Sequence, residues 1–271
     1  MKKAKKMLNR VWQSIKREEM RILPGQLAFF MVLSIFAIFP LIGLISSSFI
    51  SNELVESIEK TLPIGVYTVL EALLSVESSG SIIIFGLFAI YLASNGCGSM
   101  IITSNVIYKI KSKNIIRQKV KAIFMTVVLI LLILFIVVVP AFGELIINSI
   151  AKNYPGKIID TIGIVYHYLE YPLSFVLIFM GIKILYTLAP DERIPSRFNN
   201  NGTLFTTLLW IIITRLYAIY LNNFNTYNLF YGSLANVVIM LFWIYLLAYV
   251  FTMGMAINSD CYLESKKVSS E

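Results

Sequence analysis

The segment Thr203–Leu221, TLFTTLLWIIITRLYAIYL, contains nineteen residues with a single charge, Arg215, and neither Gly nor Pro. About 20 apolar residues, at about 1.5 Å each, form a helix that spans the hydrocarbon core of a bilayer. Arg215 lies about 18 Å from the start of such a helix. An ionised side chain at that depth must face protein, water or an opposite charge. The segment therefore predicts a membrane-spanning helix with a cation that the rest of the chain has to accommodate.

The composition of the whole chain indicates an integral membrane protein. Hydrophobic residues make up 58% of its 271 residues, and the mean hydropathy is +0.77. These values exceed those of ordinary soluble domains. We expect an all-α membrane protein with one transmembrane domain, residues 25–258, built as a bundle of six helices. The apolar segments that predict these helices are 25–50, 81–104, 121–147, 166–188, 203–222 and 235–258.

Three further segments complete the expected architecture. Residues 1–24 carry apolar side chains at helical spacing on one face and basic side chains on the other. This pattern is typical of an amphipathic helix that lies at the interface of an anionic membrane, and a solvated basic tail is the alternative. Short helices on the outer surface are expected in residues 51–80. Residues 259–271 are expected to form a cytoplasmic tail.

The distribution of Lys and Arg predicts the orientation. The N-terminal segment, the loops at 106–121 and 189–202 and the C-terminal tail together hold 18 of the 23 basic residues. The opposite side holds only 3. Because positively charged loops stay in the cytoplasm, we expect both termini there and an even number of spans.

Glu170 is the expected partner of Arg215. It is predicted to lie about 6 Å below the outer edge of the fourth span, and Arg215 about 12 Å below the same edge. Ser174 shares the helix face of Glu170, and Thr207 and Asn222 share that of Arg215. These residues predict a polar seam that is open to the outside. Its role is either binding of an anion or lipid head group on a transport path, or a structural ion pair between two helices.

The second span contains a group of small and polar residues near its middle. Small residues allow helices to approach closely. A polar residue among them either bonds to another helix or lines a cavity, and we expect packing rather than substrate binding. The residues are Asn95, Gly96, Gly98 and Ser99.

The sequence does not carry the pattern of an enzyme, cofactor or metal site. It has one histidine, His167, and two cysteines, Cys97 and Cys261, in different segments. It also lacks a P-loop, a GxGxxG motif and an HExxH motif. We therefore expect no disulfide, metal, cofactor, catalytic residue or enzymatic activity. Nucleic-acid binding is not expected either, because the basic residues follow from the membrane topology.

Residues spread over most of the chain carry a family resemblance. They are Gln26, Leu27, Ala28, Ser34, Tyr186, Pro190, Gly202, Trp210, Tyr220, Tyr227, Tyr231, Gly232, Ser233, Trp243, Tyr245, Gly254 and Asn258. In this order and spacing they resemble the YihY/BrkB family of bacterial inner-membrane proteins, once labelled ribonuclease BN. The first span departs from the family pattern, because Pro40 lies six residues after Ser34 instead of closer behind it.

The resemblance implies a six-span protein of the bacterial inner membrane, with links to virulence and envelope-lipid handling. Our first hypothesis is a transporter or flippase for an amphipathic or lipid-linked anion. A structural or scaffold protein of the envelope without transport activity is the alternative, and a membrane nuclease ranks last. The expected partners are a lipid-like substrate and anionic lipids of the inner leaflet, which the N-terminal helix would contact. The sequence also leaves room for a homo-oligomer.

Overall fold

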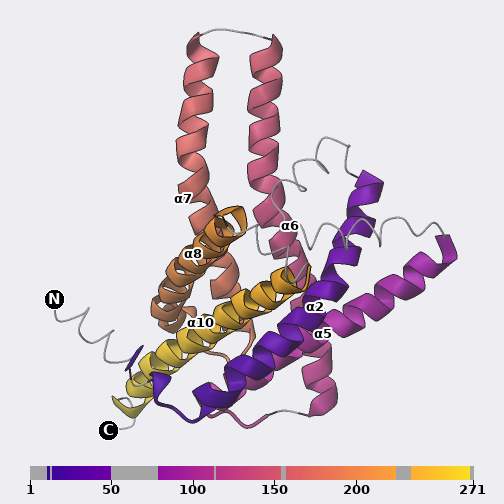
Figure 1. Cartoon of the computed structure of the whole chain (residues 1–271). Coiled ribbons are helices and arrows are strands. Elements are labelled where there is room, and N and C mark those ends of the chain that lie inside the picture. Colours follow the sequence, from indigo (N-terminus) through magenta and orange to yellow (C-terminus); the bar gives the residue numbers. More distant parts are fainter. Residues whose placement is uncertain are drawn as a thin grey trace.

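The chain folds into long α-helices that pack against one another (Figure 1). The structure, a computed structural model, describes residues 11–12, 14–49, 79–112, 114–153, 157–223 and 233–268. Its elements are α2 (Glu19–Phe49), α5 (Ser79–Tyr108), α6 (Ile115–Asn153), α7 (Lys157–Leu188), the 3-10 helix η1 (Ser196–Asn199), α8 (Asn200–Asn223) and α10 (Ser233–Val268). These described ranges contain no strand, which confirms the all-α fold.

Each of the six predicted apolar segments falls on one of the long helices. Within the described residues, four helical segments are long and apolar enough to cross a membrane, and α7 contributes a shorter apolar segment, Pro172–Leu188. The four are Leu87–Tyr108, Ile115–Ile136, Ser196–Leu221 and Val237–Lys266. The protein is therefore an all-α membrane protein, whereas its exact number of crossings stays a prediction.

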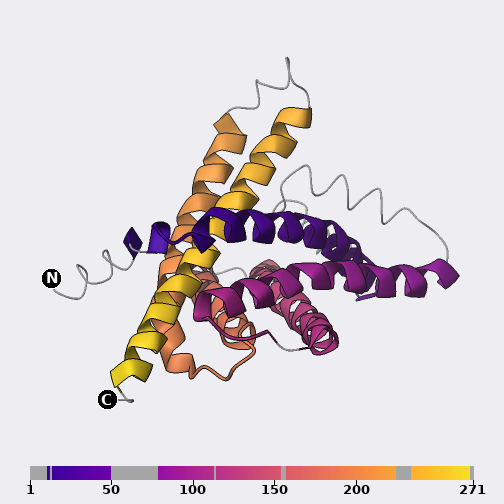
Figure 2. The same cartoon turned by 90° about the horizontal axis from the view of Figure 1, so that it is seen from below.

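The six long helices pack in a closed ring. Around the ring, α2 contacts α5, α5 contacts α6, α6 contacts α7, α7 contacts α8, α8 contacts α10, and α10 contacts α2 again. Figures 1 and 2 show the side-by-side pairs α2 with α5 and α8 with α10 from two directions. Such a ring leaves an inner space that all six helices can line.

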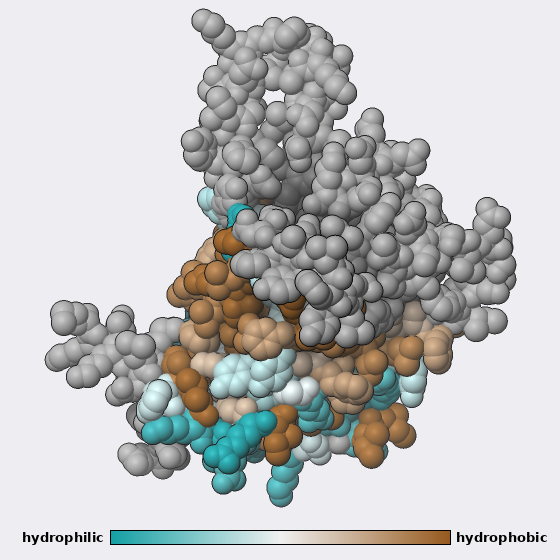
Figure 3. Space-filling model, in the orientation of Figure 1, coloured by the Kyte–Doolittle hydropathy of each residue, from teal (hydrophilic) through white to brown (hydrophobic). Residues whose placement is uncertain are grey.

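Consecutive long helices run in opposite directions, so the start of one lies at the same end of the ring as the end of the next. We call one end of the ring the polar end. It gathers the starts of α2, α6 and α8 and the ends of α5, α7 and α10, as the contacts described below show. In Figure 3 the described surface is brown over the middle of the helices and teal at this end. Its exposed charged residues among those described are Lys16, Glu18, Arg21, Lys109, Lys111, Arg117, Glu192, Arg193, Arg197, Glu264 and Lys266.

The first described residues lie at the polar end. The helix α2 begins at Glu19, earlier than the predicted start of the first span at residue 25, and residues 16–18 form a turn before it. Arg17 forms an ion pair with Asp260 near the end of α10. Trp12 is 61% exposed, and the interfacial helix expected for residues 1–24 stays a prediction. Predictions for residues 1–10 and 51–78 and for Tyr227, Tyr231 and Gly232 lie outside the described residues.

Candidate functional site

A cavity of about 600 Å³ lies within the ring of helices. Each of the six long helices contributes at least two residues to its wall, and most of these side chains are apolar. Examples, one from each helix in order, are Met31, Met100, Leu132, Ile178, Trp210 and Leu247. The volume lies within the range of about 300–1,000 Å³ that is typical of small-molecule sites.

Arg215 is the one charged residue among the described residues that line this cavity. It lies fifteen residues after the start of α8 at Asn200, which corresponds to about 22 Å along the helix. The wall also contains the hydroxyl groups of Ser34, Ser174 and Thr214. The cavity therefore combines an apolar wall with a single guanidinium group, which can donate several hydrogen bonds to an anion.

Arg215 lies at the end of the cavity that is farther from the polar end. Among the described lining residues, Arg215 on α8 and Ser174 on α7 lie farthest along their helices from the polar end. Trp243 has the same position on α10. We call this the far end of the cavity.

An aromatic group borders the cavity on the side of the polar end. The indole of Trp210 donates a hydrogen bond to the carbonyl oxygen of Leu247 at 2.9 Å and packs against Phe251 with 5.9 Å between ring centroids. Phe251 in turn packs against Tyr186 at 4.7 Å, and both are fully buried. The Tyr186 hydroxyl donates to the carbonyl oxygen of Phe251 at 2.8 Å. We call Trp210, Phe251 and Tyr186 the aromatic floor.

Glycines let α8 and α10 approach closely beneath this floor. The backbone N–H of Gly202 donates to Asn258 Oδ1 at 2.7 Å. A Cβ atom on Gly202 would collide with the carbonyl oxygen of Gly254, and one on Gly254 would collide with the hydroxyls of Tyr186 and Thr206. Gly202, Gly254 and Asn258, which carried part of the family resemblance, therefore lie together at one helix contact.

The small and polar residues of the second span lie at helix contacts. A Cβ atom on Gly96 would collide with the Ser34 side chain, whose hydroxyl donates to the carbonyl oxygen of Ala93 at 2.9 Å. Asn95 accepts a hydrogen bond from Lys119 Nζ at 2.8 Å. Gly98 and Ser99 lie on the same helix, Gly98 facing Ala122 of α6 and Ser99 buried. Gly96 and Ser34 also line the cavity, so packing and lining are combined here.

The predicted polar seam is only partly brought together. Arg215 and Ser174 line the same cavity. Thr207 is fully buried, donates to the carbonyl oxygen of Thr203 at 2.9 Å, and is not a lining residue. Thr207 and Arg215 are eight residues apart on α8, and each residue rotates the helix by about 100°. The two side chains therefore point about 80° apart around the helix axis, so Thr207 faces another helix surface than the cavity wall. The side chains of Glu170 and Asn222 lie outside the described residues.

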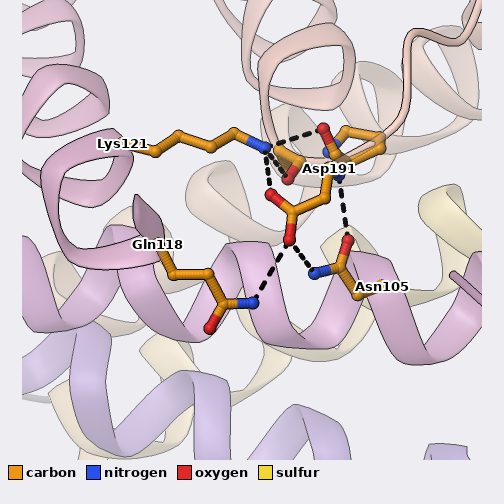
Figure 4. Close-up of polar contacts among 6 residues, drawn as sticks. Asn105, Gln118, Lys121 and Asp191 are labelled. Atoms are coloured by element: carbon orange, nitrogen blue, oxygen red, sulfur yellow. Dashed lines mark hydrogen bonds and ion pairs between the residues drawn. The ribbon is translucent and has the colours of Figure 1, made fainter. Parts of the chain in front are cut away.

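A cluster of polar side chains that the sequence analysis missed lies at the polar end (Figure 4). The Asp191 side chain, only 2% exposed, accepts hydrogen bonds from Lys121 Nζ at 3.0 Å, Asn105 Nδ2 at 2.8 Å and Gln118 Nε2 at 3.2 Å. The backbone N–H of Asp191 donates to Asn105 Oδ1 at 3.0 Å. Four residues from α5, α6 and the segment after α7 are thereby held together.

The electrostatics of this cluster favour the ionised carboxylate. Burial raises the pKa of Asp191, but the hydrogen bonds from Lys121, Gln118 and Asn105 and the charge of Lys121 outweigh it and lower the pKa from 3.8 to about 2. Lys121 also donates to the carbonyl oxygens of Ala189 and Pro190 at 2.8 and 2.7 Å, just past the end of α7. In the sequence, Lys121 is distinguished only as one of the basic residues that predict a cytoplasmic loop. The available signal was an acidic residue directly after Pro190.

The described residues show no metal-binding geometry. No three His, Cys, Asp or Glu side chains in this part of the chain lie close enough together to hold an ion. Cys97 is buried, Cys261 is half-buried, and neither forms a disulfide within the described residues.

Comparison with known proteins gives one family and several relatives. The family described as virulence factor BrkB matches residues 11–270. The protein YfkH of Bacillus subtilis, ribonuclease-like by name, is 26% identical over 87% of this chain and 87% of its own length. The UPF0761 membrane protein PSHAa0171 of Pseudoalteromonas translucida is 32% identical, over 34% of this chain and 29% of its own length. The UPF0761 membrane protein PSPA7_4558 of Pseudomonas paraeruginosa is 37% identical, over 28% and 18%. No solved structure matches.

Proposed function

Because this chain belongs to the virulence factor BrkB family of membrane proteins, we propose that its cavity carries an amphipathic or lipid-linked anion across the bacterial cell membrane, as in a transporter or flippase. The observation that carries this proposal is the position of Arg215 in the wall of an otherwise apolar cavity within the ring. A guanidinium carries a fixed charge and several hydrogen-bond donors, so it can bind the head group of an anionic substrate from this wall.

The wall chemistry supports an amphipathic substrate. Apolar side chains accept a hydrocarbon chain without leaving polar groups unsatisfied, whereas a fully polar solute would lose its hydrogen bonds to water there. Arg215, with the hydroxyl of Ser174 at the same end of the cavity, supplies donors for an anionic head group. A structural role for Arg215 alone would not require a cavity beside it.

The proposed orientation places the polar end in the cytoplasm. The exposed Lys and Arg residues of this end follow the rule that positively charged loops face inward. The ion pair between Arg17 and Asp260 supports placing both chain ends on that side. In this orientation the basic N-terminal segment contacts anionic lipids of the inner leaflet, and the far end of the cavity faces the outer leaflet.

The proposal excludes nuclease activity, although one relative carries a ribonuclease-like name. A nuclease would use clustered carboxylates or histidines with metal ions beside a basic groove. The cavity of this chain instead offers apolar side chains and one guanidinium.

Reconstitution into liposomes tests the proposal. The liposomes would contain fluorescent anionic lipids with one or two chains, and quenching from outside would report their movement between leaflets. We expect the protein to accelerate the movement of at least one of them, and Arg215→Ala to reduce this rate at least about tenfold, as loss of a charge-assisted hydrogen bond predicts. Arg193→Ala, in the exposed loop at the polar end, is the matched control and should retain the rate. Equal rates in wild type, Arg215→Ala and protein-free liposomes would refute the proposal.

A further inference from the structure

The size and wall of the central cavity specify the substrate more closely, on the assumption that the proposed transport function holds. We infer that the substrate is a single-chain amphiphile with one small anionic head, a carboxylate or a phosphate monoester, rather than a two-chain phospholipid. The cavity would hold the hydrocarbon chain, and Arg215 would bind the head.

The volume limits how much of a lipid can enter. An apolar protein cavity of about 150 Å³ holds one benzene molecule, so a cavity of about 600 Å³ holds about 24 heavy atoms at the same density. A chain of about 18 carbons that ends in a carboxylate has about 20 heavy atoms and fits, whereas a phospholipid with two such chains has more than about 40 and exceeds the space. The cavity therefore has room for one chain with a small head.

The wall indicates which part of the substrate lies inside. A protein that carries a large head group internally, with the chains left in the bilayer, needs a polar wall to replace the water around that head. Here the described polar groups on the wall are confined to the indole N–H groups and the side chains of Ser34, Ser174, Thr214 and Arg215. The wall is thus suited to a hydrocarbon chain, and only its far end is suited to a charge.

The positions of the lining residues give the orientation of the bound molecule. Ser174 and Arg215 lie at the far end, and the aromatic floor borders the cavity on the side of the polar end. Between Ser174 and Leu185, α7 lines the cavity over eleven residues, about 16 Å. The head would lie at Arg215, and the chain would extend along α7 toward Leu185. Trp210 lies five residues, about 7.5 Å, from Arg215 along α8 and would therefore flank the first part of the chain.

The protein carries its own probes for this arrangement. Of its three tryptophans, Trp210 and Trp243 line the cavity, whereas Trp12 is exposed near the N-terminus. Bromine atoms quench tryptophan fluorescence on contact. In a Trp12→Phe background, purified full-length protein in a neutral detergent would be titrated with brominated stearate at alkaline pH, where the carboxylate is ionised. The comparison ligands are brominated stearyl alcohol, which lacks the charge, and a brominated two-chain phosphatidic acid.

We expect brominated stearate to quench saturably and to bind at least about tenfold more tightly than the alcohol, because it adds a hydrogen bond between charged groups. Arg215→Gln should remove this tenfold preference. Arg215→Lys, which keeps the positive charge, should retain part of the preference. Such a difference between the two variants would show that the loss in Arg215→Gln comes from the missing charge and not from a general effect of replacing Arg215. Arg193→Gln is the matched control and should behave as wild type. In Trp243→Phe, bromines in the first half of the chain should quench Trp210 more than bromines at its end, because Trp210 lies close to Arg215 along α8.

The outcomes separate this inference from the proposed function. Binding of the two-chain phosphatidic acid as tightly as stearate, with the same dependence on Arg215, would overturn the single-chain inference and leave anion transport standing. Binding of neither anion in a manner that depends on Arg215 would refute both. Stronger quenching of Trp210 by bromines at the end of the chain would overturn the proposed orientation.

Discussion

The ammonium group of Lys121 lies 3.0 Å from a carboxylate oxygen of Asp191 and at hydrogen-bond distance from the two carbonyl oxygens just past the end of α7. One side chain from the start of α6 therefore fixes the exit of α7. This cluster lies at the polar end, and the aromatic floor lies between it and the cavity. In the proposed orientation, both lie on the cytoplasmic side of the cavity, and Arg215, the proposed anion-binding residue, lies on the outer side.

Replacing Asp191 should destabilise the helix ring. Asp191→Asn removes the charge partner of Lys121 and turns an amide N–H₂ toward the donors of Asn105 or Gln118. We expect the free energy of unfolding to fall by about 1–3 kcal/mol, the usual cost of buried groups left without partners. Thermal unfolding in detergent measures this as a lower melting temperature. Glu192→Gln, at the exposed neighbouring residue, should leave the melting temperature unchanged. Equal effects of the two variants would contradict the assigned role.

The pKa of Asp191 predicts how the stability of the protein falls at acidic pH. The folded-state pKa of Asp191, about 2, lies below its ordinary value of 3.8. Its ionisation therefore contributes stability that is complete above the ordinary pKa and is lost as the pH falls toward 2. Melting temperatures measured from neutral to strongly acidic pH should show a fall in this window that is smaller in Asp191→Asn. A fall between pH 5 and 7 that Asp191→Asn abolished would show that another environment governs this carboxylate.

Two glycines should respond oppositely to alanine. Gly202→Ala forces a Cβ atom against the backbone carbonyl of Gly254, so α8 and α10 must separate. We expect a loss of about 1–3 kcal/mol in the free energy of unfolding. Gly98→Ala places its Cβ 3.8 Å from that of Ala122, an ordinary contact, and should be neutral or stabilising by up to about 1 kcal/mol because alanine favours helices. Similar losses in both variants, measured by thermal unfolding, would contradict the close contact at Gly202.

Filling the cavity should impair binding without unfolding the protein. Gly181 lines the cavity, and an added Cβ would lie 3.6 Å from Ile136 Cδ1, so a side chain can start there without strain. Gly181→Leu should weaken the binding of long-chain amphiphiles more than that of short-chain ones, whereas Gly181→Ala should have little effect. Fluorescence titration with a series of chain lengths measures the shift. An unchanged preference for chain length in Gly181→Leu would show that the chain does not occupy this space.

A charge swap separates transport from a scaffold role. If Arg215 only fastens two helices through Glu170, the double variant Arg215→Glu with Glu170→Arg should retain function and stability. If Arg215 binds an anionic substrate, the swap should abolish transport even where the melting temperature is preserved, because a carboxylate repels the anion. Liposome transport and thermal unfolding of the same preparations distinguish the two hypotheses. Full transport by the swapped protein would favour the scaffold alternative for this residue pair.

The helices could be predicted because their signal is local. Apolar runs of about 20 residues suffice to indicate membrane helices, and each run fell on one helix. The boundaries were less accurate: α2 begins at Glu19 and α6 continues to Asn153, beyond the apolar segments. Backbone hydrogen bonding continues into polar residues, so hydropathy marks the apolar part of a helix and not its ends.

The site was only partly predictable for a geometric reason. The sequence singled out Arg215 and Ser174, and both line one cavity, but it also grouped Thr207 with them, which faces another helix surface. It missed the pairing of Lys121 with Asp191, which are separated by 70 residues. Neither fact can be read from spacing along one helix, because both depend on how neighbouring helices are rotated and crossed.

The sequence by itself determined that this is a helical protein of the membrane, because length, hydropathy and the absence of breakers act within each segment. The tertiary structure alone decided that six helices close into a ring, that the ring encloses a cavity with one guanidinium on its described wall, and that a buried carboxylate ties three helices at the polar end. These features arise from the packing of segments far apart in the chain, where close approach at glycines and the pairing of buried polar groups select one arrangement.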